Sequence, residues 1–138
     1  MAENCVFCKI LAGELPSYTV YEDDMFKAIL DINPSAEGHV ILIAKTHAEN
    51  ILETPDEYLR GALTAAKKTA AAVKRAVPCD GFNILQNNGE AAGQSQPHFH
   101  IHIIPRRIND DINMKWNFLK FTKEQFTQTA DKIKKYID

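Results

Sequence analysis

Three histidines alternate with apolar residues in the segment His98-Phe99-His100-Ile101-His102-Ile103-Ile104. Successive side chains of a β-strand point to opposite faces. A strand here would carry the three imidazoles on one face, about 6.7 Å apart, and the apolar side chains on the other. Near neutral pH, imidazole can act as nucleophile, proton donor or metal ligand. The segment therefore predicts a site in which histidines carry the chemistry.

The spacing alone leaves two chemistries open for this row. The histidines can act directly on a substrate as nucleophile and proton donor. Alternatively, two of them at positions i and i+2 of one strand can bind zinc together and leave a coordination position open for water. A half-exposed strand without function is the plainest alternative, but the alternation runs through the whole segment.

A polar loop runs directly into the histidine strand. Its glycines, Gly89 and Gly93, let backbone N–H groups approach a phosphate closely. Neutral hydrogen-bond donors, which suit the binding and release of an anion, stand beside them at Asn87, Gln94 and Ser95. The same residue types are common in ordinary surface loops, so it is the position next to the histidines that favours an anion-binding loop.

The chain has three cysteines, an odd number that does not fit a disulfide framework. The pair Cys5-x-x-Cys8 is too short to close a metal site by itself. With His47 and His98 it supplies two thiolates and two imidazoles, a set typical of structural zinc. Two buried thiols without metal are the alternative, and a thioredoxin-like role is disfavoured because no βαβ pattern surrounds the pair. Cys79 and His39 are interpreted as structural residues.

The elements that must position these residues form an α+β pattern. Strands are predicted over residues 19–22, 25–30, 39–44, 81–86 and 98–104. Because the connections between them do not repeat a βαβ unit, we expect a mainly antiparallel sheet of five strands.

Helices are predicted on either side of the histidine strand and at the start of the chain. A capping box at Thr54 opens a long helix that runs to about Ala76, and one at Thr122 opens a C-terminal helix that runs to Tyr136. A short helix covers residues 5–11. The long helix is expected to cover an apolar face of the sheet.

Composition narrows the possible functions. The 138 residues suit one domain, and the contents of 45% hydrophobic and 25% charged residues are ordinary for a soluble globular protein. A net charge of −2 without a basic patch argues against nucleic-acid binding. No apolar run approaches the roughly 20 residues that span a bilayer, and the first residues lack a signal-peptide pattern. We therefore expect a cytoplasmic protein without nucleic-acid or membrane partners.

Together these segments resemble the histidine triad (HIT) superfamily. The matching pieces are Asp31-Ile32-Asn33-Pro34, Gly38-His39-Val40-Ile41-Leu42-Ile43, Lys45-Thr46-His47, Asn87, Gly93-Gln94-Ser95 and the histidine row. The resemblance covers residues 5–107 and is greatest for the Hint branch, the nucleoside phosphoramidase type, although Ala44 replaces the proline common there. It implies a HIT-like fold, a single HIT domain over residues 1–138 with a C-terminal segment and helix from 108, and a homodimer.

The resemblance also implies roles for individual residues. His100 would be the nucleophile that forms a nucleotidyl-histidine intermediate, and His102 would donate a hydrogen bond to the phosphate. Asp31 matches the position that holds the ribose hydroxyls. The remaining matches are Asn87, Gly93 and Ser95 near the phosphate and leaving group, with Gln94 between them, and Phe7, Ile32, Val6, Ile10 and Ile29 in a base pocket.

Relatives that begin in the same way carry a zinc ion, so the resemblance supports a structural zinc at Cys5, Cys8, His47 and His98. No metal would be required for catalysis. The roles of Arg106, Arg107 and the Trp116 segment stay open.

The predicted activity is cleavage at the α-phosphate of a purine nucleoside phosphoramidate or related nucleotidyl substrate, with release of a nucleoside monophosphate. The alternatives are a dinucleoside polyphosphate hydrolase, a zinc hydrolase that uses the triad as ligands, and a non-catalytic purine-nucleotide-binding adaptor.

Overall fold

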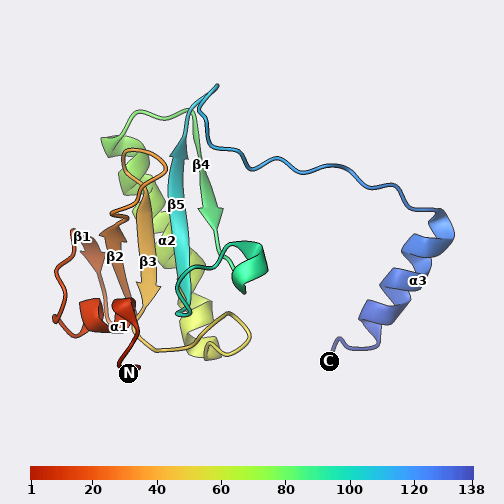
Figure 1. The fold of residues 1–138 in the computed structure, drawn as a ribbon, viewed down its shortest axis with the longest axis horizontal. Coiled ribbons are helices and arrows are strands. Elements are labelled where there is room, and N and C mark those ends of the chain that lie inside the picture. The colour runs from red at the N-terminus through yellow and green to blue at the C-terminus, as the bar shows by residue number, and fades with distance from the viewer.

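The computed structural model describes residues 1–138. One five-stranded sheet forms its centre, with every neighbouring pair antiparallel and the strands in the order β1-β2-β3-β5-β4 (Figure 1). The strands are β1 (Thr19–Glu22), β2 (Phe26–Leu30), β3 (Val40–Ala44), β4 (Gly81–Leu85) and β5 (His100–Arg106). The helices are α1 (Val6–Leu11), α2 (Asp56–Ala76), the 3₁₀ turn η1 (Glu90–Ala92) and α3 (Lys123–Lys134). The predicted α+β class and five-stranded sheet are confirmed.

The two faces of the sheet are covered by different helices. On one face, the alternate residues Val40, Leu42 and Ala44 of β3 pack with Phe99, Ile101 and Ile103 against the alanine-rich side of α2. On the other face, Ile41 and Ile43 pack with α1. The period-2 alternation of the strands thus separates a core under α2 from the opposite face, on which the even-numbered histidines of β5 lie.

Several predicted boundaries differ from the structure by one or two residues, and three differences concern residues with a predicted role. Thr54 does not cap α2, because its hydroxyl donates to the carbonyl of Asn50 at 2.8 Å and Pro55 occupies the N-cap position. β5 begins at His100, so His98 lies before the strand. α3 ends at Lys134 instead of Tyr136, although its predicted capping box between Thr122 and Gln125 is present.

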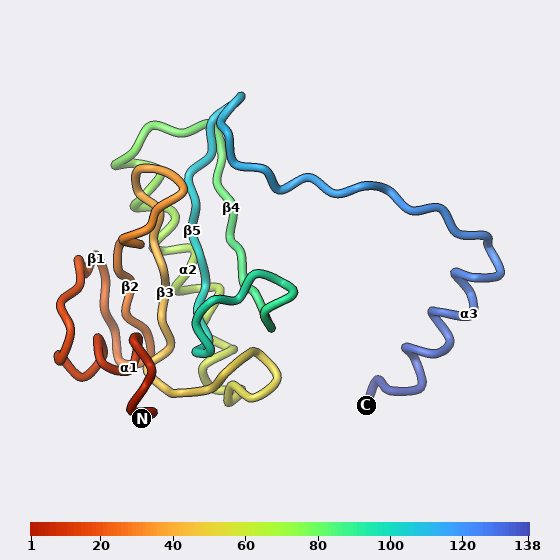
Figure 2. The backbone as a smooth tube through the Cα atoms, viewed as in Figure 1, coloured from red at the N-terminus to blue at the C-terminus, as the bar shows by residue number.

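The chain beyond β5 leaves the body of the molecule as an extended segment that ends in α3 (Figure 2). We call residues 113–138 the C-terminal arm. Every residue of this arm from 115 onward is exposed. The arm begins at a tight cluster in which the Arg106 guanidinium donates to both carboxylate oxygens of Asp110, each at 2.8 Å. None of the helices is both long enough and apolar enough to span a bilayer.

Candidate active site and metal centre

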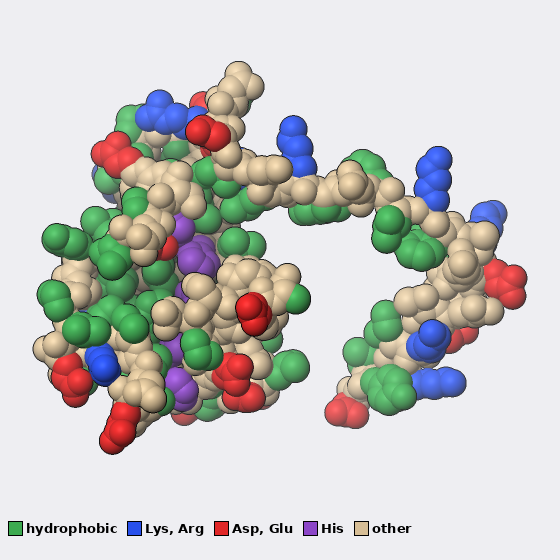
Figure 3. Space-filling view, viewed as in Figure 1, with side chains coloured by type: hydrophobic (Ala, Val, Ile, Leu, Met, Phe, Trp, Pro, Cys, Tyr) green, Lys and Arg blue, Asp and Glu red, His purple; other side chains and the backbone are tan.

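A cavity of about 320 Å³ opens beside the histidines of β5. His100 and His102 line it from the strand, and Asp31 lines it from the segment after β2. In the space-filling view, histidine side chains lie along a furrow in the body of the molecule (Figure 3). His100 is only 4% exposed, and it is one of the residues that line this cavity.

The backbone around His100 fixes which of its ring nitrogens is protonated. The Nδ1 of His100 lies 2.5 Å from the carbonyl oxygen of His98. Since a carbonyl only accepts, Nδ1 must carry the proton and donate it. The Nε2 of the neutral ring then keeps its lone pair free, which is the form required of a nitrogen nucleophile.

A second chain of hydrogen bonds gives His102 the opposite arrangement. The backbone N–H of Ser35 donates to Nδ1 of His39 at 3.0 Å. Neutral His39 must therefore carry its proton on Nε2, which lies 2.9 Å from Nδ1 of His102. With its Nδ1 accepting, neutral His102 presents an N–H at Nε2. One histidine thus offers a lone pair and the next offers a donor.

Burial favours the neutral form of all three rings. It lowers the pKa of His100 and, against the nearby Asp31 carboxylate, the pKa of His39. It lowers the pKa of His102 to about 4, with further lowering from His100 and His39. The three rings are therefore neutral near pH 7, where the tautomers derived above hold, and they become protonated only at lower pH.

Asp31 occupies the rim of the cavity and has two contacts. Its Oδ1 accepts the backbone N–H of Asn33 at 2.8 Å, which makes the turn after β2. Its Oδ2 lies 3.5 Å from Nε2 of His39. The carboxylate thus serves the turn and also faces the cavity, where it can accept hydrogen bonds from sugar hydroxyls.

An apolar wall closes the other side of the cavity. Phe7 is buried and its ring stands edge-on to His100, with 5.0 Å between the centroids. Ile32 is 77% exposed at the rim. The matched positions Val6, Phe7, Ile10, Ile29 and Ile32 all line this cavity. A flat apolar slot next to a carboxylate suits a nucleoside.

Only some residues of the loop before β5 line this cavity. Ser95 lines it, whereas Gly93 and Gln94 line a neighbouring depression that Ser95 also borders. Gln94 braces the loop, since its side chain accepts from the N–H of Gly89 at 2.7 Å and donates to the carbonyl of Glu49 at 2.6 Å.

Asn87 lies behind this loop and donates to the carbonyl of Gly93 at 3.4 Å. Gly93 has φ +89°, and an added Cβ would lie 3.4 Å from the Asn87 amide nitrogen. The structure therefore brings Ser95 to the histidines and leaves Asn87, Gly93 and Gln94 shaping the loop around it.

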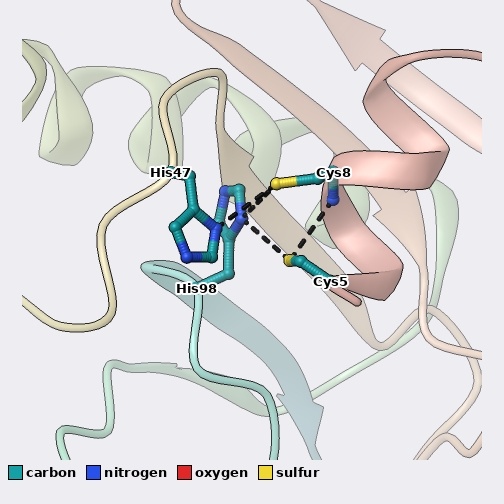
Figure 4. A group of neighbouring side chains, drawn as sticks. All are labelled: Cys5, Cys8, His47 and His98. Carbon is teal, nitrogen blue, oxygen red and sulfur yellow. Dashed lines mark hydrogen bonds between the residues drawn. The ribbon is translucent and has the colours of Figure 1, made fainter. Parts of the chain in front are cut away.

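A second group of side chains joins the N-terminal segment to the start of β5 (Figure 4). Cys5 Sγ lies 3.3 Å from Nδ1 of His98. Cys8 Sγ lies 3.3 Å from Nδ1 of His47 and 3.5 Å from Nδ1 of His98. The four ligand atoms all lie within 4.8 Å of one another. The four residues predicted from the cysteine spacing are thus brought together.

The geometry of this group fits a tetrahedral metal ion. Zinc bonds of about 2.3 Å to sulfur and 2.0 Å to nitrogen place tetrahedral S and N ligands about 3.6 Å apart, close to the separations found. The Nε2 of His98 lies 2.7 Å from the carbonyl of Ala44, so it carries the proton and leaves Nδ1 free toward the sulfurs. Burial raises the pKa of the Cys8 thiol, a thiol that a cation would keep ionised.

Sequence reasoning did not place His39 at the site. In the structure its side chain contacts both Asp31 and His102. The alternation of the predicted strand 39–44 contained a signal, because His39 has the same parity as Ile41, which lines the cavity. Arg106 anchors the C-terminal arm and Trp116 is exposed on it, so neither lies in the cavity.

Comparison with known protein families gives one match, the HIT domain, over residues 12–109. Protein hit of Bacillus subtilis is 50% identical over 105 residues, which is 76% of this chain and 72% of that protein. The adenosine 5'-monophosphoramidase HNT1 of Saccharomyces cerevisiae is 45% identical, with 75% and 63% covered. The adenylylsulfatase HINT3 of Arabidopsis thaliana is 41% identical, with 90% and 65% covered.

Crystal structures of relatives have the same fold. A member of the HIT family from Bacillus subtilis superimposes with a TM-score of 0.93 at 41% identity, over 99% of both chains. A HIT family protein from Bacillus anthracis gives 0.92 at 36% identity, over 100% of both chains. A zinc-bound histidine triad family protein from Mycobacterium smegmatis gives 0.75 at 38% identity, over 83% of both chains.

Proposed function

Since this chain belongs to the histidine triad family and to its Hint-like branch, we propose that it hydrolyses purine nucleotides at the α-phosphorus, with nucleoside 5'-phosphoramidates as the substrate class. The apolar slot at Phe7 and Ile32 takes the base, and Asp31 accepts hydrogen bonds from the ribose. The phosphate then lies against His100 and His102, next to the loop that carries Ser95.

On this proposal the reaction proceeds in two steps. The lone pair on Nε2 of His100 forms a bond to the α-phosphorus while the bond from phosphorus to the leaving amine breaks and the amine takes up a proton from solvent. Water then attacks the phosphorus and gives up a proton to solvent, the bond to Nε2 breaks, and nucleoside monophosphate leaves with the neutral imidazole restored. The N–H at Nε2 of His102 stabilises the negative charge of the phosphoryl oxygens in both steps.

One observation carries this proposal: the carbonyl of His98 accepts from Nδ1 of His100 and so leaves Nε2 as a nucleophile. On this proposal no metal acts at the reacting atoms. His100 and His102 do not belong to the group Cys5, Cys8, His47 and His98, and in the second possible metal-binding group, Asp31, His39 and His102, the Nδ1 of His102 accepts from His39.

The test is release of AMP from adenosine 5'-phosphoramidate by the wild type and by His100→Ala. We expect kcat/KM to fall by at least about 10³-fold, since loss of a nucleophile removes the covalent route. In the wild type, rapid acid-free quenching followed by mass spectrometry should find one nucleotidyl group on the peptide that contains His100. AMP affinity and melting temperature, measured on the same samples, control for folding.

The alternative functions give different results in this experiment. A zinc hydrolase would lose metal together with activity in His100→Ala. A non-catalytic adaptor would bind AMP without turnover in the wild type. If dinucleoside polyphosphates are hydrolysed faster than phosphoramidates, they become the proposed substrate class and the mechanism stands. A fully active His100→Ala variant would refute the mechanism itself.

We further propose that Cys5, Cys8, His47 and His98 hold a structural zinc ion in a cytoplasmic homodimer. The donor set and the S–N separations near 3.4 Å support the ion. The double variant Cys5→Ser, Cys8→Ser should contain no zinc, and Cys79→Ser is the matched control that should retain it. Zinc retained in the double variant would refute the ligand set.

A further inference from the structure

Two cysteines of the metal group lie side by side at the start of α1. The backbone N–H of Cys8 donates to Sγ of Cys5 at 3.4 Å. Both sulfurs belong to the group of ligand atoms that all lie within 4.8 Å of one another, and both cysteines are free. Cys-x-x-Cys is also the spacing of thiol pairs that convert between the reduced form and a disulfide. The two sulfurs are thus placed to react with each other once one of them is oxidised.

The surroundings of the two sulfurs differ. Both cysteines are buried, but only Cys8 lines a cavity of about 400 Å³ beside the first residues of the chain, where Met1 and Lys9 also line it. Cys5 does not line this cavity, and its Sγ lies 3.3 Å from Nδ1 of His98. We therefore expect a small solute such as hydrogen peroxide to reach Cys8 before Cys5.

The cysteine pair is connected to the active-site cavity in two ways. Phe7 lies between the two cysteines in sequence, and its ring centroid lies 5.0 Å from that of His100 and 5.8 Å from that of His98. The Nδ1 of His98 contacts both sulfurs, while its carbonyl accepts from Nδ1 of His100. A rearrangement of the two sulfurs therefore acts on both neighbours of the His100 ring.

We propose that Cys5 and Cys8 form a peroxide-sensitive pair, in which oxidation to a disulfide releases the zinc ion and slows hydrolysis at His100. The first part rests on the proposed zinc ligands and the second part on the proposed function. The oxidised species is this chain itself, so the proposal differs from thioredoxin-like exchange with other proteins.

Hydrogen peroxide is the oxidant, and the reaction has two steps. The Cys8 thiolate attacks one peroxide oxygen, the O–O bond breaks, and the hydroxide that leaves takes up a proton, which gives water and a sulfenic acid on Cys8. The Cys5 thiolate then attacks Sγ of Cys8, the S–O bond breaks, and a second hydroxide leaves and is protonated to water. The two thiolates have lost two electrons and one peroxide has become two waters. A structural zinc site needs four ligands, so the ion left with His47 and His98 dissociates.

The first test treats the zinc-loaded wild type with hydrogen peroxide and follows the metal and the thiols. Released zinc is measured with a colorimetric chelator, and mass spectrometry of the digested protein locates the disulfide. We expect one zinc ion to be released for each Cys5–Cys8 disulfide formed, together with a fall in melting temperature. A thiol reductant with added zinc should reverse all three changes. Cys79→Ser, which removes the cysteine outside the metal group, is the matched control and should behave like the wild type.

The second test identifies the sulfur that reacts first. Dimedone, a reagent that traps sulfenic acids, is present while the wild type is oxidised. It should label Cys8 and leave Cys5 unlabelled. In Cys5→Ser the label on Cys8 should increase, because no second thiol removes the sulfenic acid, whereas Cys8→Ser should give no label on Cys5. Label on Cys5 in the wild type would contradict the proposed order of attack.

Hydrolysis is measured on the same samples. We expect oxidation to lower kcat for AMP release about 10- to 100-fold, the effect typical of disturbing a neighbour that orients a functional histidine. Reduction with added zinc should restore kcat. An untreated wild type without turnover would refute the proposed function, yet zinc release and the disulfide would still be measured, so the two failures are distinguishable.

Three results would overturn the proposal. Zinc that stays bound after peroxide treatment would show that the pair is protected by its metal. Oxidation of Cys8 to a sulfinic acid without a disulfide would show that Cys5 does not react with it. Full turnover by the disulfide-bonded, zinc-free protein would show that the metal group and His100 are independent.

Discussion

At the scale of single residues, His100 and His102 lie two positions apart yet present opposite hydrogen-bonding groups to the cavity. The carbonyl of His98 fixes the tautomer of His100, and His39 fixes the tautomer of His102. Loss of the group that fixes the tautomer of a functional histidine commonly lowers activity about 10- to 100-fold. The arrangement makes His39 a positioning residue that acts through His102.

Replacement of His39 should therefore reduce turnover without reducing nucleotide binding. In His39→Leu the Nδ1 of His102 loses its donor, and we expect kcat to fall about 10- to 100-fold with KM little changed. His39→Gln keeps an N–H donor on the side chain and should recover part of the rate. ¹⁵N NMR of the His102 ring reads the tautomer directly, and an unchanged tautomer in His39→Leu would contradict this role.

The buried histidines also make stability depend on pH. Burial lowers the folded-state pKa of His102 to about 4, whereas the unfolded chain titrates near 6.5. Between these two pH values the unfolded state binds more protons than the folded state. The contribution of His102 to the free energy of unfolding is therefore complete above about pH 6.5 and declines as the pH falls toward 4. His39 and His100, whose pKa values are also lowered, add to the same slope.

Urea unfolding at a series of pH values checks this dependence. The free energy of unfolding should fall steadily from pH 7 to pH 4, and His102→Asn should show a shallower slope over the same range. A slope identical to that of the wild type would mean that His102 is not titrating in this window.

Sequence reasoning singled out His100 as the proposed nucleophile but did not bring His39 to its neighbour His102. His100 and His102 stand out because three histidines alternate in one strand. His39 lies 63 positions away from His102, and only the pairing of β3 with β5 brings them together. A pattern within one strand carries no information about which strand lies beside it.

At the scale of the elements, two glycines near α2 have opposite requirements. Gly38 has φ +84°, and a Cβ there would lie 2.9 Å from Cγ2 of Val77, just beyond the end of the helix. Gly61 is inside α2, where an added Cβ would lie 3.8 Å from the ring of Phe26, an ordinary contact distance.

The same substitution should thus have opposite signs at these two positions. Gly38→Ala should lower the free energy of unfolding by about 1–3 kcal/mol, because it adds both strain and a close contact. Gly61→Ala should raise it by roughly 0.5–1 kcal/mol through helix propensity. Urea midpoints measure both, and a stabilised Gly38→Ala would show that the turn before β3 can relax.

The boundaries of the elements show where sequence patterns stop being sufficient. The capping box at Thr122 is present because nothing competes for its hydroxyl in the exposed arm. The one predicted at Thr54 fails because that hydroxyl is used by the carbonyl of Asn50 in the preceding turn. Both capping boxes have the same sequence signature. Whether the threonine caps its helix therefore depends on whether another acceptor nearby takes its hydroxyl.

At the scale of the whole molecule, the metal group connects segments that are distant in the chain. Cys5 and Cys8 flank the start of α1, His47 follows β3 and His98 precedes β5. An ion held by all four would brace α1, and with it Phe7, against β5.

Removal of this metal should therefore affect both stability and activity. We expect a strong chelator to lower the melting temperature, because ligand binding to the folded state alone stabilises it. It should also lower kcat, since movement of His98 disturbs the acceptor of His100. Zinc added back should restore both quantities. A melting temperature unaffected by complete zinc removal would contradict a structural role.

The position of the arm is the part of the molecule that the sequence could not provide. Its helix is visible in the capping box and the apolar repeat, whereas the direction in which it leaves the body depends on the contact between Arg106 and Asp110. Hydrophobic pattern predicts that a face is buried, but it does not name the surface that buries it.

His98 contributes through its side chain to one centre and through its main chain to the other. The carbonyl oxygen that leaves Nε2 of His100 unprotonated is thus present whatever amino acid occupies position 98. In a saturation mutagenesis screen, substitutions of His98 would therefore report only the loss of its side chain from the metal-binding group. Its part in choosing the attacking atom would go unrecorded, because no codon change deletes a peptide oxygen.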